Sequence, residues 1–312
     1  MDIKGRFSDS VTSVVVRKRF PVAVSIDVTS RCNLRCKHCY FLTQGWREEL
    51  PFERWLPVLE EWRRRGIRHA TWVGGEPLLR GGLIEAGRRF FPLNWVVTNG
   101  TFLLPRWKDV SYFVSLDGTK RYNDSLRGRG VYDKVRTNLE VYGGRNLCMA
   151  MGINRFNESC VEDFVEEWAG NDGVMGVNLD FYTPLRSDDE LVLSFPERDV
   201  VVERLRALRR EYGDFLLLSE RILDLMLSKN CGSVTNNCQV KQAVICLDPM
   251  GRRKYPCVMG YQSDCSRCGC IIPYFIQAFF IEMDPETIRT HGRMLARMHI
   301  PFTSILRAVI YR

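Results

Sequence analysis

Six short apolar runs, rich in β-branched residues, recur along the chain, and each is followed by a segment with helical spacing. The runs are VAVSIDVT (22–29), HATWVGG (69–75), NWVVTNG (94–100), VSYFVSLDG (110–118), NLCMAMGIN (146–154) and VNLDFYTPL (177–185). Runs of this kind are typical of buried strands, and their alternation with helices is typical of a parallel sheet with helical crossovers. The sequence therefore predicts an α/β fold, either an open doubly wound sheet or a barrel.

The segments between and after these runs have the spacing of amphipathic helices. After about residue 230 the alternation stops, and the chain becomes loop-rich and cysteine-dense up to 270. A final helix is predicted in DPETIRTHGRMLARMH (284–299). The other predicted helices are 51–66, 82–91, a short segment near 101–107, 132–144, 158–170, 196–212 and 219–229.

Twelve cysteines in 312 residues need an explanation, because a chain of this length with 45% hydrophobic residues folds without disulfide staples. Ten of them crowd into two groups, at 32–39 and 231–270. The sequence shows no signal peptide and no apolar stretch of the roughly 20 residues that a spanning helix needs. We therefore expect a cytoplasmic protein whose clustered thiols bind metal. The net charge of +8 is compatible with anionic partners but selects none.

The first cysteine group follows the first predicted strand, at the edge where barrels and open α/β sheets build their sites. Cys32, Cys36 and Cys39 have the spacing C-x3-C-x2-C. Three thiolates suit a cubane iron–sulfur cluster in which one iron has no protein ligand. The alternatives are a structural zinc site completed by His38, or unpaired core cysteines.

The loop CNLRCKHCY, after a strand that ends in VTSR, resembles the signature loop of the radical S-adenosylmethionine (SAM) superfamily. The resemblance implies a partial (β/α)6 TIM barrel and a [4Fe-4S] cluster on Cys32, Cys36 and Cys39, whose open iron is chelated by SAM. It also implies reductive cleavage of SAM to a 5′-deoxyadenosyl radical that functionalises an unactivated carbon of the substrate. An electron donor such as ferredoxin or flavodoxin is then a partner.

Further segments resemble the family's SAM-binding motifs at the ends of later strands. GGEP is similar to the glycine-rich motif that receives the ammonium of SAM, and TNG and SLDG are similar to segments that follow it. By this resemblance Ser115 contacts the ribose or carboxylate, Arg127 the carboxylate, and Asn154 the ribose. The SAM-binding residues implied are Tyr40, Gly74, Gly75, Glu76, Pro77, Asn99, Ser115, Arg127 and Asn154.

The second cysteine group has enough thiols to close a metal site. DPMGRRKYPC resembles the strand–turn–strand segment of the SPASM and Twitch extensions of this superfamily, which carry auxiliary [4Fe-4S] clusters. One auxiliary cluster is implied, on Cys246, Cys257, Cys265 and Cys268. Cys270 is an alternative to Cys268, and Cys231 or Cys238 to Cys246. A zinc ribbon on the same cysteines is the other interpretation.

The substrate is less constrained. The tail CVMGYQSDCSRCGCIIPYFIQAFF resembles radical SAM enzymes that adenosylate hopene lipids, and their archaeal relatives that act on isoprenoid lipids. IIPYFIQAFFI (271–281) could then line an apolar channel or touch a membrane, or it could pack against the barrel. The alternative is a radical SAM maturase of a ribosomally made peptide, and a further one is a zinc-stapled basic protein that binds nucleic acid.

These observations divide the chain into four predicted parts. They are an N-terminal hairpin or extension (1–21), the radical SAM partial barrel (22–218), a small cysteine-rich auxiliary region (219–275) and a helical tail (276–312).

Overall fold

The computed structural model of this chain describes residues 21–186 and 189–297. The predicted N-terminal hairpin or extension at 1–21 lies almost wholly outside the described residues. The part of the predicted helical tail beyond residue 297 lies outside them as well.

The described strands form one eight-stranded sheet in the order β6-β5-β4-β3-β2-β1-β7-β8. Neighbouring strands are parallel except β7 and β8, which are antiparallel. The predicted α/β fold with a radical SAM type of partial barrel is confirmed. The strands are β1 (Ala23–Asp27), β2 (His69–Val73), β3 (Leu93–Thr98), β4 (Val110–Ser115), β5 (Leu147–Ile153), β6 (Val174–Phe181), β7 (Val244–Leu247) and β8 (Arg253–Lys254).

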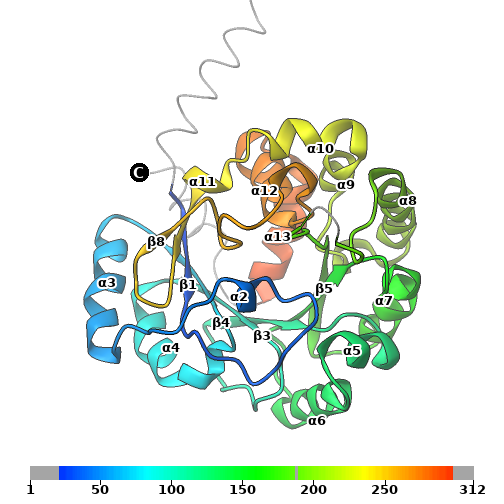
Figure 1. The fold of residues 1–312 in the computed structure, drawn as a ribbon. Coiled ribbons are helices and arrows are strands. Elements are labelled where there is room, and N and C mark those ends of the chain that lie inside the picture. The colour runs from blue at the N-terminus through cyan, green and yellow to red at the C-terminus, as the bar shows by residue number, and fades with distance from the viewer. Residues whose placement is uncertain (1–20, 187–188, 298–312) are drawn as a thin grey trace, which may run out of the picture.

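Helices cover the outer face of the sheet, and α3 to α8 surround the strands in Figure 1. The described helices are α2 (Tyr40–Thr43), α3 (Phe52–Arg64), α4 (Gly81–Gly87), α5 (Lys120–Arg127), α6 (Val131–Tyr142), α7 (Val161–Ala169), α8 (Phe195–Tyr212), α9 (Glu220–Met226), α10 (Ser228–Thr235), α11 (Val240–Ala243), α12 (Ile271–Ile276) and α13 (Pro285–Arg297). Shorter helical turns span Pro77–Arg80, Arg88–Phe90, Glu158–Cys160, Gly213–Phe215, Cys265–Arg267 and Gln277–Ile281.

The main core lies between the sheet and this outer layer of helices. Trp72 of β2 is fully buried and so are Trp55 and Leu59 of α3, because these helix positions fall on one face of the helix. Parallel strands covered by helices must be apolar on nearly every residue, and all five residues of β1 are buried. The sheet is therefore a rigid base for the loops at the carboxyl ends of its strands.

Three predictions about the helices differ from the structure. The segment near 101–107 forms no helix, and the predicted helix at 219–229 is two helices, α9 and α10. The polar segment KRYNDSLR, for which no helix was predicted, forms α5, and its Leu126 and Asn123 are buried. Helix α8 begins as predicted, at a capping box between Ser194 and Glu197.

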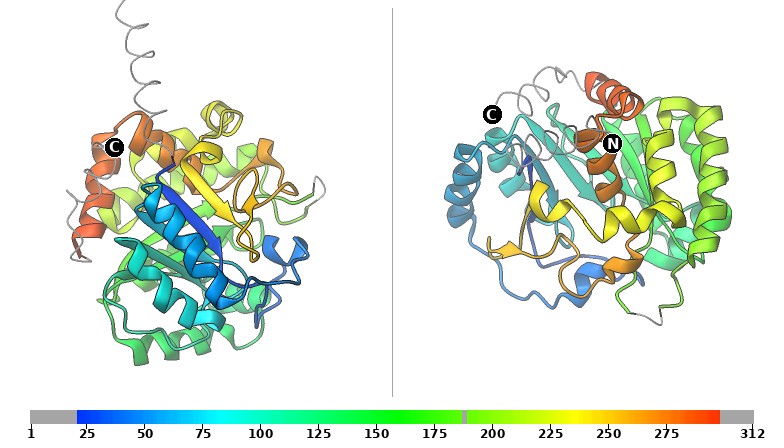
Figure 2. Two further views of the ribbon diagram at one scale, coloured as in Figure 1. Left: turned by 90° about the vertical axis from the view of Figure 1, so that its left-hand side faces the viewer. Right: turned by 90° about the horizontal axis from the view of Figure 1, so that it is seen from above.

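The C-terminal region continues the main sheet, although the strand–helix alternation ends before it. Strand β7 pairs in parallel with β1, so that Cys246 lies opposite Ser25. In Figure 2 the yellow strand lies directly beside the blue one. The predicted strand–turn–strand segment is therefore present as β7 and β8, and its first strand extends the barrel at the β1 edge.

The apolar run IIPYFIQAFFI packs inside the protein. Ile271, Tyr274 and Ala278 are buried in contact with the main core, and Phe279 is buried as well. The interpretation in which the run packs against the barrel is therefore the one observed. No helix among residues 21–186 and 189–297 combines the length and the apolar character needed to cross a bilayer.

Candidate active site

The first cysteine loop leaves the carboxyl end of β1 and ends where α2 begins. Cys32, Cys36 and Cys39 are each partly exposed, and Cys39 donates its backbone N–H to the carbonyl of Cys36 at 3.2 Å. Burial raises the pKa of Cys32, and it raises the pKa of Cys36 to about 11. The Cys39 thiolate raises the pKa of both further, so the three thiols lie near one another.

The arrangement of these thiols fits a cluster better than a single metal ion. Within the described ranges, no group of three or more His, Cys, Asp or Glu side chains converges as a mononuclear site requires. In a cubane each thiolate binds a different iron, so the sulfur atoms spread around the cluster. Nε2 of His38 pairs with Asp117 at 3.1 Å, which fixes the imidazole ring beside the cysteine loop.

Asp117 is the centre of a buried charge network beside the cysteine loop. The side chain follows β4 and pairs with Nε of Arg127 at 2.6 Å as well as with His38. Burial acts to raise the pKa of Asp117, but Arg127 and His38 outweigh it and hold the pKa well below its usual range. Asp117 in turn raises the pKa of Arg127 against the opposing effect of burial. The carboxylate therefore stays ionised and fixes both partners.

The resemblance implies that Arg127 binds the SAM carboxylate, and in the structure Arg127 already forms an ion pair with Asp117. The ion pair with Asp117 uses Nε, and the described residues give no hydrogen bond from either Nη group. A guanidinium presents five N–H donors in a fixed fork, so the Nη side remains available to a carboxylate ligand. The structure therefore gives Arg127 a buried anchor while leaving part of its donor set free.

The Glu76 carboxylate is fully buried and accepts hydrogen bonds from three donors of the chain. The backbone N–H of Leu78 and Oγ1 of Thr98 donate to Oε1 at 3.0 and 2.8 Å, and the backbone N–H of Asn99 donates to Oε2 at 2.8 Å. Burial raises the pKa of Glu76, while these hydrogen bonds act to lower it. Glu76 therefore ties the end of β2 to the end of β3, a structural role that the motif alone does not reveal.

Gly74 and Gly75 are required by close backbone packing. A Cβ atom on Gly75 would lie 2.0 Å from the carbonyl oxygen of Arg31, and one on Gly74 would lie 2.8 Å from that of Thr29. The Gly75 N–H donates to the Thr29 carbonyl at 3.0 Å. The two glycines therefore seat the end of β2 against the start of the cysteine loop, and Pro77 then begins a helical turn.

The remaining predicted SAM-binding residues lie on the same side of the sheet. Asn99 donates from Nδ2 to Oδ1 of Asn33 at 2.9 Å, and the same nitrogen is 3.8 Å from the sulfur of Cys32. Asn154 is buried and accepts the Phe156 N–H at 2.9 Å, within its own turn. Ser115 is partly exposed at the end of β4, and burial raises the pKa of Tyr40 at the start of α2.

Sequence reasoning missed two acidic features of this region. In SLDG only Ser115 was given a role in SAM binding. The structure shows instead that Asp117 pairs with His38 of the cysteine loop and with Arg127 of α5. The position of Asp117 directly after a buried strand was the signal that could have pointed to it. Asp180, near the end of β6, was given no specific role. Burial raises the pKa of Asp180 to about 7, and the negative charge of Asp117 contributes in the same direction.

Four thiols of the second cysteine group raise one another's pKa values. Burial raises the pKa of Cys238, and the charges of Cys265 and Cys268 raise it further. Burial raises the pKa of Cys257, and the charges of Cys238 and Cys265 raise it further. Burial likewise raises the pKa of Cys268, and the charges of Cys257 and Cys265 add to that rise. These mutual effects connect every pair among the four thiols, which we call the auxiliary thiol set.

The pKa values of Cys246 and Cys231 respond less to the other thiols of this group. Burial raises the pKa of Cys246 to about 12, and Cys257 is the only thiol among the main contributors. Burial raises the pKa of Cys231, Arg198 acts to lower it and Asp199 acts to raise it; no thiol is among the main contributors. Burial also raises the pKa of Cys270, and the charges of Cys268 and Cys257 raise it further. Cys238 and Cys246 both remain candidates for the fourth ligand, and Cys270 remains an alternative to Cys268.

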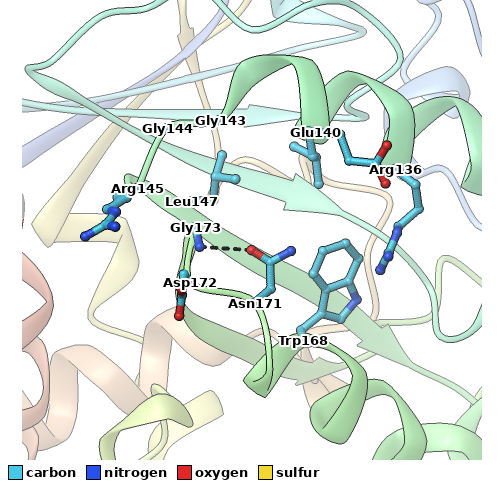
Figure 3. A pocket seen from close by; sticks show the side chains of 11 residues that line it. Arg136, Glu140, Gly143, Gly144, Arg145, Leu147, Trp168, Asn171, Asp172 and Gly173 are labelled. Atoms are coloured by element: carbon cyan, nitrogen blue, oxygen red, sulfur yellow. Dashed lines mark hydrogen bonds between the residues drawn. The ribbon is translucent and has the colours of Figure 1, made fainter.

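A separate hollow lies at the opposite end of the sheet. Figure 3 shows it between the loops that precede β5 and β6, with a volume of about 300 Å³. Asn171 and Gly173, joined by a hydrogen bond of 2.9 Å, line one side, and Trp168 lines another. Because the cysteine loop follows the carboxyl end of β1, this hollow at the amino ends of parallel strands is remote from it.

Comparison with known proteins agrees with a functional site at the cysteine loop. The Radical SAM superfamily matches residues 26–167. The sporulation killing factor maturation protein SkfB of Bacillus subtilis is 30% identical over 214 residues, covering 63% of this chain and 52% of SkfB. The pre-heme d1 synthase of Dinoroseobacter shibae is 33% identical over 155 residues, covering 45% of this chain and 38% of the synthase. The chain thus spans about half the length, or less, of these relatives.

Solved structures show the same fold at low sequence identity. SuiB of Streptococcus suis, bound to the precursor peptide SuiA, has a TM-score of 0.63 and 13% identity over 86% of this chain and 68% of SuiB. The anSMEcpe structure with bound AdoMet and Kp18Cys peptide has a TM-score of 0.60 and 14% identity over 93% of this chain and 99% of that chain. The resemblance to lipid-modifying enzymes is not supported by these matches. The motifs, the strand order and the family match together establish that residues 26–167 belong to the Radical SAM superfamily.

Proposed function

We propose that this chain is a radical SAM enzyme that acts on a peptide. The observation that carries the first part is the loop after β1, where Cys32, Cys36 and Cys39 gather at the carboxyl edge of a parallel sheet. These three cysteines would hold a [4Fe-4S] cluster and leave one iron open to SAM. When bound, this group and SAM supply a 5′-deoxyadenosyl radical that abstracts a hydrogen atom from the substrate.

The chain's own residues would bind and orient SAM. Arg127, anchored through Nε by Asp117, would donate from its Nη groups to the SAM carboxylate. Asn99 would hold the loop beside Cys32, and Glu76 would fix the ends of β2 and β3 around the ammonium. The other proposed contacts of SAM are Tyr40, Gly74, Gly75, Pro77, Ser115 and Asn154.

We assign a second [4Fe-4S] cluster to the auxiliary thiol set, with Cys238 in place of the predicted Cys246. Four thiolates complete the coordination of a cubane, so this cluster would have no open iron. Cys246 is fixed in β7 by its pairing with β1, whereas the other three predicted ligands lie in loops or turns. A second closed cluster would serve electron relay or hold the C-terminal region in place.

The peptide substrate is supported by what the relatives are. SkfB, at 30% identity, is a maturation protein for a sporulation killing factor. SuiB and anSMEcpe, which share the fold, have been captured with peptides. The substrate first predicted from sequence, an isoprenoid lipid, rested on the resemblance of the tail, and the apolar run at 271–281 that accompanied it is largely buried.

Anaerobic reconstitution tests the proposal directly. Protein loaded with iron and sulfide should contain about eight irons per chain and should convert SAM to 5′-deoxyadenosine when dithionite is added. Replacing Cys32, Cys36 and Cys39 together by alanine should remove about four irons and all of this product. Cys148→Ala, at a buried cysteine of β5 outside both groups, is the matched control and should retain both. Loaded protein that forms no 5′-deoxyadenosine would refute the proposed function.

A further inference from the structure

A buried arginine with no carboxylate partner lies beside the second cysteine group. Arg198, near the start of α8, is 3% exposed. In the part of the chain that the structure describes, no Asp or Glu side chain pairs with its guanidinium, and Nε has no hydrogen-bond partner. A buried charge is costly unless an opposite charge lies near it. The partial positive charge at the N-terminal end of a helix adds to that cost.

Neutral groups surround the guanidinium. Nη2 donates to the carbonyls of Arg267 and Tyr182 at 2.8 and 3.3 Å, and Nη1 donates to that of Cys268 at 3.3 Å. The rings of Phe181 and Phe195 have centroids 5.4 and 5.6 Å from Cζ, close enough for cation–π attraction. Carbonyl dipoles and aromatic rings carry no net charge, so these contacts orient the cation without neutralising it.

The same contacts hold the turn that carries two of the auxiliary thiols. The carbonyls of Arg267 and Cys268 belong to this turn, whereas Tyr182 follows β6 directly, so the guanidinium ties the turn to the sheet. Cys268 is held from two further sides. The Tyr274 O–H donates to its carbonyl at 3.3 Å, and Oγ1 of Thr183 lies 3.9 Å from its sulfur. The chain itself therefore fixes Cys268.

The groups near Arg198 that can become anions include thiols of the second cysteine group. Burial acts to lower the pKa of Arg198, and the main opposing contributions come from Tyr274, Cys231 and Cys268 rather than from a carboxylate. A thiol that binds a metal is deprotonated, and a cubane on four thiolates carries a net negative charge. A cluster on the auxiliary thiol set would therefore bring the missing counter-charge to Arg198.

We infer that Arg198 is a positioning residue of the auxiliary centre, which holds Cys268 by its backbone and favours the reduced state of the cluster by its charge. The inference rests on the proposed function, and within it only on the second cluster. Reduction transfers one electron from the reductant to an already anionic group, with no bond made or broken and no proton moved. A buried cation beside a ligand stabilises the added negative charge, because net charge and hydrogen bonds near the sulfur atoms set the potential of such clusters.

The test uses the full chain with Cys32, Cys36 and Cys39 replaced by alanine, so that only the second cluster is present. The midpoint potential of that cluster is measured by a dithionite titration followed by EPR. Adding Arg198→Met should make the cluster about tenfold harder to reduce, which corresponds to a potential about 59 mV lower for one electron. Adding Arg198→Lys keeps a cation at this position, so the change should be at most about threefold.

Two comparisons separate the charge of Arg198 from its hydrogen bonds. Arg198→Lys and Arg198→Met both lose the guanidinium fork, so a purely structural role would lower the melting temperature of both and leave their potentials alike. The matched control, Arg210→Met, removes an exposed arginine from the last turn of the same helix. The potential and iron content of the control should equal those of the background protein.

An Arg198→Met variant that cannot hold iron also decides the matter. Full iron loading in Arg198→Lys would then support the inference, since lysine restores the cation, and loss of iron in both variants would overturn it. Equal potentials in Arg198→Met and the background protein, or the same shift in Arg198→Lys as in Arg198→Met, would overturn it as well.

Failure of the proposed function gives a different result. A background protein without iron would refute the second cluster and the inference with it. A parent that forms no 5′-deoxyadenosine with dithionite, although its second cluster shows the potential that depends on Arg198, would refute the radical SAM activity and leave the inference standing.

Discussion

The Lys254 ammonium on β8 pairs with the carboxylate of Asp27, the last residue of β1, and both side chains are buried. The same ammonium lies 3.3 Å from Oε1 of Gln44, just after α2. Despite Lys254, burial raises the pKa of Asp27 to about 6. One ion pair thus joins the C-terminal hairpin to the strand from which the cysteine loop departs.

Removing the ammonium should destabilise the protein in a pH-dependent way. Lys254→Met leaves a buried carboxylate unpaired, and we expect a loss of about 3–5 kcal/mol in the free energy of unfolding near neutral pH. The pKa of Asp27 is already raised in the folded state, so its contribution is present at low pH and is lost as pH rises through about 6. Without Lys254 the folded pKa rises further, so denaturant titrations should show a larger deficit at pH 8 than at pH 5.

Two companion variants make that prediction specific. Asp27→Asn combined with Lys254→Met should recover part of the lost stability, because no unpaired charge is left buried. Lys241→Met, at an exposed lysine of α11, should have little effect. A deficit in Lys254→Met that does not change with pH would contradict the role given to Asp27.

Neutralising Asp117 should disturb the cysteine loop through Arg127. In Asp117→Asn the buried guanidinium loses its counter-charge, and breaking such a pair costs about 3–5 kcal/mol. We expect a lower melting temperature and weaker SAM binding, measured by equilibrium dialysis on reconstituted protein. Asp133→Asn, which removes the exposed partner of Lys120 at the other end of α5, should leave both measurements nearly unchanged.

The assignment of Cys238 to the auxiliary cluster can be decided by counting iron. Cys238→Ala should contain about four irons per chain after reconstitution, whereas Cys246→Ala should keep about eight. The physical reason is placement, because Cys246 is a buried residue of β7 and Cys238 lies with the other three thiols. The reverse pattern of iron content would return the fourth ligand to Cys246.

Adding one methyl group at Gly75 should separate β2 from the cysteine loop. In Gly75→Ala the new Cβ would meet the Arg31 carbonyl at 2.0 Å, and backbone atoms on both sides cannot rotate away. We expect reduced iron loading and a lower melting temperature, by iron analysis and calorimetry. Gly81→Ala, where no atom lies within 4 Å of the added Cβ, should load iron normally.

Much of the fold follows from periodicity, and the departures from it have local causes. The six apolar runs coincide with β1 to β6 because strands covered on both faces are apolar at almost every position. Helix α5 was missed because its sequence has no continuous apolar stripe, and its buried residues are few. Strand β7 was missed as a member of the main sheet because four residues carry little signal, and its pairing with β1 spans more than 200 positions of the chain.

The site was predictable to the level of motifs and less so in its contacts. The spacing of Cys32, Cys36 and Cys39 located the loop, but the sequence could not show that Arg127 is anchored by Asp117. For the second cysteine group the spacing predicted Cys246 as a ligand with Cys238 as its alternative, and the pKa contributions among the thiols add weight to Cys238. Linear spacing ignores the strand that carries Cys246 away from the loops of the other thiols.

The pairing of β7 with β1 also protects the protein from self-association. Without β7, the backbone N–H and C=O groups along one side of β1 would be unpaired, and an open edge of this kind recruits strands from other molecules. A chain shortened to end before residue 244 should therefore aggregate even if its barrel helices form. The C-terminal hairpin therefore occupies the edge of β1, the strand that leads to the cysteine loop, and keeps it from pairing with other chains.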